Sequence, residues 1–343
     1  MRSSRRPPPR GPLHGWSTIS ALRVKRHRGD CPSFRPLERE EETFMKTDIS
    51  FNTEDGVALA AWFFAAKGAT GPAPTVIMSH GFSATKEMHL QGFAETFQTA
   101  GMNVLVYDNR NLGDSAGEPR GEIDPEQQIR DYRDAITYAQ SRDDVDGERI
   151  GIWGSSYSGG HVLVVAAKDR RVKCVISQVP LVQGLDNARR LVRSDHWLGL
   201  RAGFVADRQG RMRGEAPLTL PVVGNGPEDP CALPTDDSRE FFTSLPPENL
   251  GSWKNEITLR SMEMFTEYEP ADYISRIGPT PLMMVVGRYD HLTPADMTLA
   301  AYERALEPKK LLILDCHHFE AYTGEMFRIS APAQCAWFVE HLM

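Results

Sequence analysis

The chain has 343 residues, of which 41% are hydrophobic and 25% charged, with a formal net charge of −7. This composition predicts a soluble protein with a sizeable apolar core and excludes a wholly disordered chain. No uninterrupted apolar run approaches the roughly 18–20 residues that a membrane helix needs, so no membrane contact is expected.

The charge is unevenly distributed along the chain. Residues 1–44 carry 10 Lys and Arg against 5 Asp and Glu, whereas the rest carries 29 against 41. An acidic body argues against nucleic acid as the main partner. The five cysteines show no CxxC spacing. This usage favours reduced thiols and a cytoplasmic location.

Residues 1–44 do not have the pattern of a folded segment. The stretch MRSSRRPPPRGPLHG is rich in Arg and Pro and has no hydrophobic period. Three interpretations stay open: a disordered tail, an organelle-targeting segment, or an over-extended start before Met45. The first and third are favoured. We therefore expect a disordered or non-native extension over 1–44 and one α/β domain over 45–343.

From Met45 onward the pattern is that of alternating strands and helices. An Asp-Gly turn at 55–56 separates two strand-like runs and predicts a hairpin. A helix is predicted over 125–141, and another over 294–306 with Thr293 as its cap. Besides the hairpin, six strand-length runs are apolar on both faces and alternate with the helical stretches: 75–81, 103–109, 150–155, 173–179, 282–288 and 310–316. This pattern predicts an α/β fold, with a mostly parallel sheet covered by helices on both faces.

One interval is too long for a plain crossover between strands. The run at 173 and the run at 282 are 109 residues apart. We expect an inserted cap over about 183–270, with helices at 184–213 and 247–267 and a Pro- and Gly-rich loop at 219–234 between them. Such a cap would cover the carboxyl ends of the strands, where open α/β sheets bind ligands.

The stretch WGSSYSGG, residues 153–160, joins a strand to a helix. A Ser at such a sharp turn, with Gly two residues before it, has the arrangement of a nucleophile elbow. Ser156 fits with Gly154 at −2, although Ser158 stands at +2 where Gly is usual. Ser155 would have Trp153 at −2, and Ser158 would lie in the first helical turn. The alternative is a strand–helix turn without chemistry.

A serine needs a base and an orienting acid to act as a nucleophile. Asp290 follows one strand end, and His317 and His318 follow the last strand, so the chain order is Ser, Asp, His. Asp315 is a rival acid, and only one of the two histidines can be the base. For His161 and His291, which fit neither position, core or solvated roles are expected.

The oxyanion of an acyl-transfer reaction needs two backbone N–H donors. One would come from Tyr157, the residue after the nucleophile, and the other from the loop that follows the run at 75–81. Phe82 is the candidate there, because Gly81 lets the backbone turn. The alternative is that His80-Gly81 is only a strand-end turn.

Taken together, SHGFSATKE, YDNRNLGDSAGEPRGEI, WGSSYSGG, YDHLTPAD and HHFEAY resemble the α/β-hydrolase superfamily over about 46–343. Within it, the chain is similar to dienelactone-hydrolase-like proteins that include fungal polyketide transferases and thiohydrolases, and more distantly to the X-Pro dipeptidyl-peptidase and cocaine-esterase group. The resemblance implies Ser156 as nucleophile, Asp290 as acid and His318 as base. Such proteins carry Gly-His-Phe at the base, whereas His317 replaces that Gly here. Asn109 and Asn111 also depart from the usual Asp-x-Arg-Gly loop, which we interpret as structural.

The resemblance implies a serine hydrolase that cleaves an ester or thioester through an acyl-enzyme, without a metal or cofactor. The dienelactone hydrolases proper use Cys, so their lactone chemistry is not carried over. Two alternatives stay open: an acyltransferase that releases a polyketide or acyl chain from a carrier, and a non-catalytic relative that binds a small molecule. A peptidase is a further rival, ranked below an esterase or thioesterase.

The cap offers expectations about partners. Its apolar side chains would line a pocket for a small-molecule acyl substrate: Trp197, Leu198, Phe204, Phe241, Phe242, Met262, Met264 and Phe265. Residues 189–213 hold seven Arg against two Asp. This segment is a candidate contact for coenzyme A or an acyl carrier protein, with a solvated helix face as the alternative. A homodimer is compatible with the sequence.

Overall fold

The computed structural model describes residues 46–226 and 228–343. By its internal contacts the chain divides into two units, Met1–Thr43 and Phe44–Met343, and all of the described residues belong to the second. The expectation of an extension over 1–44 therefore lies outside the described residues. Within them, no helix has the length and apolar character that crossing a membrane requires.

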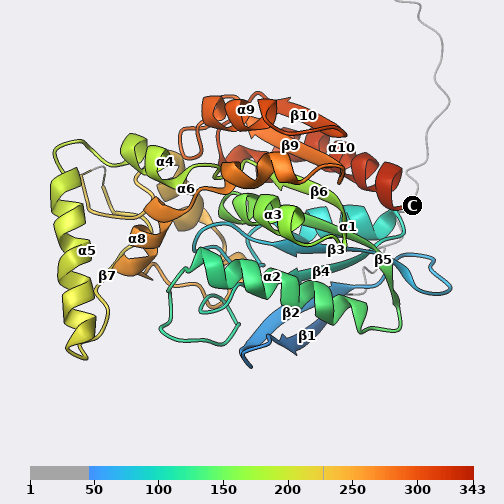
Figure 1. Ribbon diagram of the computed structural model, residues 1–343, viewed down its shortest axis with the longest axis horizontal. Coiled ribbons are helices and arrows are strands. Elements are labelled where there is room, and N and C mark those ends of the chain that lie inside the picture. The colour runs from blue at the N-terminus through green and yellow to red at the C-terminus, as the bar shows by residue number, and fades with distance from the viewer. Residues whose placement is uncertain (1–45, 227) are drawn as a thin grey trace, which may run out of the picture. The chain divides into compact units, whose positions relative to one another are not determined.

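An eight-stranded sheet forms the centre of the second unit (Figure 1). Its strands lie in the order β1-β2-β4-β3-β5-β6-β9-β10, and neighbours are parallel except in the pairs β1–β2 and β2–β4. The strands are β1 (Lys46–Asn52), β2 (Ala58–Phe64), β3 (Ala73–Ser79), β4 (Asn103–Tyr107), β5 (Val145–Ser155), β6 (Val172–Gln178), β9 (Leu282–Gly287) and β10 (Lys309–Leu314). The mostly parallel sheet is as predicted.

Apolar runs located the parallel strands well. All six predicted runs are strands, and five begin and end within two residues of the predicted limits. The exception is β5, which begins at Val145 instead of 150 because Val145 pairs with Ala73 of β3 beyond a register shift. Strands β3, β4 and β9 are buried along their whole length, as expected for strands covered on both faces.

The N-terminal hairpin is also confirmed. Strands β1 and β2 pair antiparallel with Asn52 opposite Ala58. The turn between them is closed by hydrogen bonds from Thr53 N to Val57 O and from Gly56 N to Thr53 O, both 2.9 Å long. Gly56 has a φ of +85°, which few other residues adopt without strain.

Helices cover both faces of the sheet (Figure 1). On one face lie α1 (Gln91–Thr99) and α10 (Gly324–Leu342), whose Phe93, Phe97 and Phe338 belong to one hydrophobic core. On the other face lie α2 (Pro125–Gln140), α3 (Tyr157–Lys168) and α9 (Ala295–Glu303), which contribute to a second core. The sheet therefore has a separate apolar layer on each side.

The two predicted helices differ in how well their starts were placed. Helix α2 begins as expected, with Asp124 accepting hydrogen bonds from Glu126 N and Gln127 N. Helix α9 does not begin with a Thr293 cap, because Pro294 occupies the cap position. The Thr293 hydroxyl lies 2.9 Å from Asp290 Oδ2 and 3.0 Å from Val179 O instead.

The segment between β6 and β9 is more divided than predicted. Its elements are α4 (Gly184–Leu191), α5 (Trp197–Met212), β7 (Thr219–Leu220), α6 (Asp236–Ser244), α7 (Pro247–Leu250), β8 (Ile257–Thr258), α8 (Leu259–Glu267) and η1 (Pro270–Arg276). The single helix predicted over 184–213 is wrong, because Val192 is extended and ends α4. The helix predicted over 247–267 is also wrong, since Gly251 has a φ of +54°.

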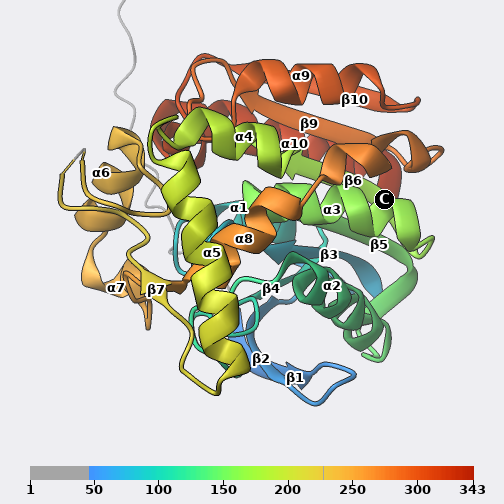
Figure 2. The same ribbon diagram turned by 60° about the vertical axis from the view of Figure 1, so that its left-hand side comes forward.

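The expected loop over 219–234 includes a short strand. Strand β7 pairs antiparallel with β8, which joins the two halves of the inserted segment. Helices α4 and α5 both pack on α8, and Figure 2 shows α5 crossing it. We call residues 183–270 the cap segment below.

Candidate active site

Ser156 lies at the sharp turn between β5, which ends at Ser155, and α3, which begins at Tyr157. Its φ of +56° and ψ of −114° are rare for a residue with a side chain. Backbone hydrogen bonds hold this conformation, since Ser156 N donates to Gln178 O at 2.8 Å and Ser156 O accepts from Leu181 N at 2.9 Å. The local geometry is that of a nucleophile elbow.

The structure explains why Gly is required before Ser156 while Ser is accepted after it. A Cβ on Gly154 would lie 2.0 Å from Ser158 O, so no larger residue fits at that position. The side chain of Ser158 is fully buried, and its Oγ has no hydrogen-bond partner. Ser155 is also buried, with its Oγ against the hydroxyl of Tyr322. Of the three serines, Ser156 alone lines the cavity described below.

Asp290 and His318 meet at the carboxyl edge of the sheet. Asp290 follows β9, His318 follows β10, and Asp290 Oδ2 lies 2.7 Å from His318 Nδ1. Both side chains are about 1% exposed. Since the carboxylate accepts the Nδ1 proton, Nε2 of His318 is left as an acceptor. The arrangement fixes one tautomer of the imidazole.

Asp290 accepts further hydrogen bonds besides the one from His318. Its Oδ1 accepts from Leu292 N and Thr293 N, each at 2.8 Å, and Thr293 Oγ1 lies 2.9 Å from Oδ2. A buried carboxylate needs such donors to replace lost water. Thr293 was missed as a site residue, because its pattern resembles a helix cap.

The rival residues lie in other surroundings. Asp315 forms an ion pair with Arg288 at the surface. The ring of His317 packs beside those of Tyr289 and His291. His161 is buried in the core between Tyr268 Oη at 2.8 Å and Gln128 Oε1 at 2.9 Å. Burial lowers the pKa of His161 to about 3.

The two expected oxyanion donors flank Ser156. A Cβ on Gly81 would lie 2.7 Å from Ser156 Cβ and 3.2 Å from its Oγ, so the backbone before Phe82 packs directly on the serine. Within the described residues, the N–H of Phe82 has no acceptor, and Tyr157 N–H begins α3 and has none within that helix. Two unused backbone donors therefore lie beside the candidate nucleophile.

Ser156, His318 and Phe82 line a common cavity. No hydrogen bond joins the side chains of Ser156 and His318 among the described residues; such bonds often tighten only when substrate binds. The wall is mainly apolar, and the cap segment contributes Leu191, Leu233, Phe241, Phe242 and Phe265.

Three of the eight cap residues expected in the pocket therefore line it: Phe241, Phe242 and Phe265. Leu198 does not, since 80% of its surface is exposed to solvent, and Met262 lines a neighbouring cavity. Sequence reasoning missed Phe319 and Tyr322, although both belong to the same HHFEAY stretch as His318.

Residues 55–320 match the family model of the X-Pro dipeptidyl-peptidases, the S15 family. The chain belongs to this family. It is 30% identical to the thiohydrolase aneE of Aspergillus aculeatus, over 87% of this chain and 93% of that protein. It is 32% identical to the quorum-quenching protein AidA of Acinetobacter baumannii, over 82% and 90%.

Comparison with solved structures identifies this S15-family chain as an α/β hydrolase. The crystal structure of the α/β hydrolase GrgF from Penicillium sp. sh18 matches with a TM-score of 0.76 and 31% identity, covering 87% of this chain and 99% of that one. The predicted superfamily and its fungal thiohydrolase and polyketide-transferase branch are therefore confirmed.

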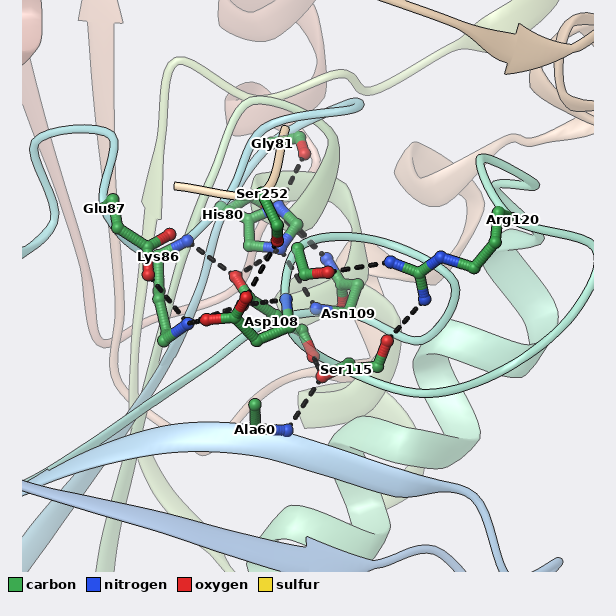
Figure 3. A network of polar contacts seen from close by, with 12 residues as sticks. Ala60, His80, Gly81, Lys86, Glu87, Asp108, Asn109, Ser115, Arg120 and Ser252 are labelled. Atoms are coloured by element: carbon green, nitrogen blue, oxygen red, sulfur yellow. Dashed lines mark hydrogen bonds and ion pairs between the residues drawn. The ribbon is translucent and has the colours of Figure 1, made fainter. Parts of the chain in front are cut away.

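An ionic network centred on the buried Lys86 and Asp108 holds the loop between β3 and α1 of this S15-family chain (Figure 3). Lys86 Nζ lies 2.7 Å from Asp108, 2.7 Å from Glu87 and 2.9 Å from Asp114. Burial alone would lower the pKa of Lys86, but Asp108 and the other carboxylates raise it above its ordinary value. These three carboxylates could together hold a metal ion, but the ammonium already lies among them.

The loop that departs from the usual Asp-x-Arg-Gly pattern takes part in this network. Asn109 N donates to His80 Nε2 at 3.0 Å, and Asn111 Nδ2 donates to Glu122 O at 3.1 Å. Arg110 pairs with Asp131 and with Asp55. The contacts of all three residues are internal to the fold, in line with the structural role predicted for this loop.

Proposed function

We propose that this protein is a serine hydrolase that cleaves carboxylic esters or thioesters through an acyl-enzyme on Ser156. The observation that carries the proposal is the buried hydrogen bond between Asp290 and His318. His318 lines the same cavity as Ser156, which lies at a nucleophile elbow. The thiohydrolase and transferase names of its relatives support acyl chemistry as the reaction class.

In the proposed first half-reaction, Ser156 Oγ bonds to the carbonyl carbon while its proton passes to His318 Nε2. The N–H groups of Phe82 and Tyr157 donate to the oxyanion. Collapse of this intermediate breaks the bond to the alcohol or thiol, which leaves with the proton from His318. Asp290 holds the imidazole in place and stabilises its charge.

In the second half-reaction, His318 takes a proton from water, and the hydroxide attacks the acyl group on Ser156. Collapse of this second intermediate breaks the bond between the acyl carbon and Ser156 Oγ, which takes the proton back from His318, and the carboxylic acid is released. Another alcohol or an amine in place of water would give an acyltransferase. The apolar wall of the cavity and the relative named a polyketide transferase, 34% identical over 79% of this chain, favour this second candidate.

The proposal is tested by turnover of p-nitrophenyl esters and of acyl thioesters of N-acetylcysteamine with increasing chain length. Ser156→Ala and His318→Ala are expected to lower kcat by about 10⁴-fold or more. His317→Ala, the matched control, should stay within about threefold of wild type. Adding an alcohol or amine and measuring how the acyl group divides between water and acceptor separates hydrolase from acyltransferase.

Two results would contradict the proposal. Retained turnover in Ser156→Ala would show that another group is the nucleophile. A folded wild-type protein that binds the ester without cleaving it, with the same affinity in Ser156→Ala, would favour a non-catalytic binding protein.

We also propose an anionic carrier, such as coenzyme A or an acyl carrier protein, as partner of α5. The arginines of its C-terminal end are each paired with a carboxylate 2.8 Å away: Arg208 with Glu263, Arg211 with Asp207 and Arg213 with Glu215. Such pairs leave less free positive charge than the sequence indicates. Reversing all three charges should raise KM for an acyl-coenzyme A and weaken its salt dependence. Unchanged values would contradict the carrier contact.

A further inference from the structure

His80 is a buried histidine beside the candidate oxyanion site. It directly follows β3, and only about 1% of its surface is exposed. Its Nδ1 lies 3.0 Å from the carbonyl oxygen of Gly81, and its Nε2 lies 3.0 Å from the backbone nitrogen of Asn109 (Figure 3).

These two contacts determine where the imidazole carries its proton. A carbonyl oxygen only accepts, so Nδ1 must donate to Gly81 O. A backbone N–H only donates, so Nε2 must be unprotonated and accept from Asn109 N. Burial also lowers the pKa of His80, which keeps the ring neutral. His80 is therefore a neutral histidine with one defined tautomer.

The carbonyl that His80 holds belongs to the same peptide group as the N–H of Phe82. This peptide is not among the cis bonds of the described chain, so its C=O and N–H point in opposite directions. Fixing the Gly81 carbonyl on the side of His80 therefore fixes the direction of the Phe82 N–H. Ala84 N also donates to this carbonyl, at a longer 3.3 Å.

The surroundings of this peptide leave its N–H free for a ligand. Gly81 packs against Ser156, and the Phe82 N–H has no acceptor among the described residues. The far side of the His80 ring is held by the backbone of Asn109, which follows Asp108 of the ionic network. A continuous chain of contacts thus runs from the Lys86–Asp108 pair to the Gly81–Phe82 peptide.

We propose that His80 is the positioning residue of the oxyanion site, and that its Nδ1–H orients the Gly81–Phe82 peptide toward the substrate oxyanion. This inference rests on the proposed function and names a residue that the acyl-transfer steps do not use. Both ring nitrogens of His80 already have backbone partners, so its effect would be on the transition state through Phe82.

Two substitutions separate the donor from the acceptor role of His80. Asn places an amide N–H close to the position of Nδ1 and keeps the bond to Gly81 O. Gln reaches the position of Nε2 with a carbonyl oxygen and keeps the bond from Asn109 N. We expect His80→Gln to lower kcat by about 10²-fold or more with KM within about threefold, as for loss of an oxyanion donor. His80→Asn should retain kcat within about tenfold.

A second measurement uses an alkyl boronic acid, which forms a tetrahedral adduct with a serine nucleophile. Its affinity should fall in proportion to kcat/KM across the variants, while the affinity for the product carboxylic acid stays constant. A merely structural role would not produce this correlation. Urea unfolding of each variant shows that it is folded.

Equal losses of kcat in both variants, or a loss confined to KM, would overturn the inference. If His80→Gln does not fold, His80→Asn decides alone: kcat within tenfold of wild type supports the inference, and a 100-fold loss overturns it. A wild-type protein that neither cleaves esters nor binds the boronic acid overturns the proposed function, and this inference with it. Wild-type turnover with unaffected variants overturns the inference only.

Discussion

Two carboxylates that follow neighbouring strand ends differ completely in their surroundings at the scale of single residues. Asp290 is buried and bonded to His318, whereas Asp315 is 68% exposed and pairs with Arg288. We predict that Asp290→Asn lowers kcat for ester hydrolysis by about 10³- to 10⁴-fold, because the amide N–H would favour the wrong tautomer of His318. Steady-state kinetics check this, with Asp315→Asn expected within about twofold of wild type.

Equal losses in the two variants would contradict the assignment of Asp290 as the acid. A loss of kcat in Asp315→Asn alone would identify Asp315 as the acid, against the expectation from its exposed position.

The contact between Gly81 and Ser156 leads to a second prediction for a single residue. A Cβ at position 81 would lie within 2.7 Å of Ser156 Cβ, so the two backbones must separate. Gly81→Ala is expected to lower kcat by at least about 100-fold and the free energy of unfolding by about 1–3 kcal/mol. Kinetics and urea unfolding measure both. Gly71→Ala is the control, since a Cβ there meets no atom within 4 Å; similar effects in both variants would contradict the prediction.

The sequence was enough to nominate some candidate site residues but not to identify the role of others, for a physical reason. The positions of Ser156, Asp290 and His318 follow from chain order and strand ends, which meet at one edge of a parallel sheet. The direction of a side chain does not follow from chain order, so order alone left His317 and His318 as alternatives. The family resemblance implied His318, and the structure places His318 beside Asp290. Thr293 was predicted as a cap for the same reason.

At the scale of elements, the loop between β3 and α1 depends on Lys86. This lysine is nearly buried among three carboxylates. Lys86→Met should lower the free energy of unfolding by about 3–5 kcal/mol, because it leaves Asp108 buried without its cation. Urea unfolding measures the loss. Arg130→Met, which breaks the exposed pair with Glu126, should cost less than about 1 kcal/mol.

If Lys86→Met is no less stable than Arg130→Met, the buried network is not what holds this loop. The double variant Lys86→Met, Asp108→Leu should recover part of the stability, since it removes the uncompensated carboxylate together with the cation.

Strands and cap helices differed in how far sequence could predict them. Runs such as 282–288 are apolar on both faces and bounded by turns, so burial alone identifies them. In the cap segment, long-range contacts determine the secondary structure. Strands β7 and β8 have only two residues each, and each is a strand because it pairs with the other. A local pattern carries no information about such a partner, and both cap helices were drawn too long.

At the scale of the whole molecule, buried neutral histidines make stability depend on pH. The folded protein keeps His161 unprotonated down to its pKa of about 3, whereas the unfolded chain takes up a proton near the ordinary value of 6.5. The free energy of unfolding therefore falls as pH drops from about 6.5 toward 3, by about 1.4 kcal/mol per pH unit for one proton. Urea unfolding between pH 4 and 6.5 measures this slope.

His161→Gln should reduce the slope by about one proton, because the group that titrates only in the unfolded chain is gone. His196→Gln is the control, since that side chain is 59% exposed. Parallel curves for wild type and His161→Gln would contradict the prediction.

The overall architecture was predictable because alternation of strand and helix permits few arrangements of a parallel sheet. The long interval between 173 and 282 likewise located the inserted segment. Which cap side chains reach the cavity was not predictable, since Phe241 and Leu198 both read as apolar cap residues. One lines the pocket and the other faces solvent.

The most direct test of the account is to label the folded protein with a fluorophosphonate and locate the adduct by peptide mass spectrometry. We predict one adduct, on Ser156, that is lost in Ser156→Ala and kept in Ser158→Ala. Absence of an adduct on folded wild-type protein, or an adduct that persists in Ser156→Ala, would contradict the central claim that Ser156 is the nucleophile.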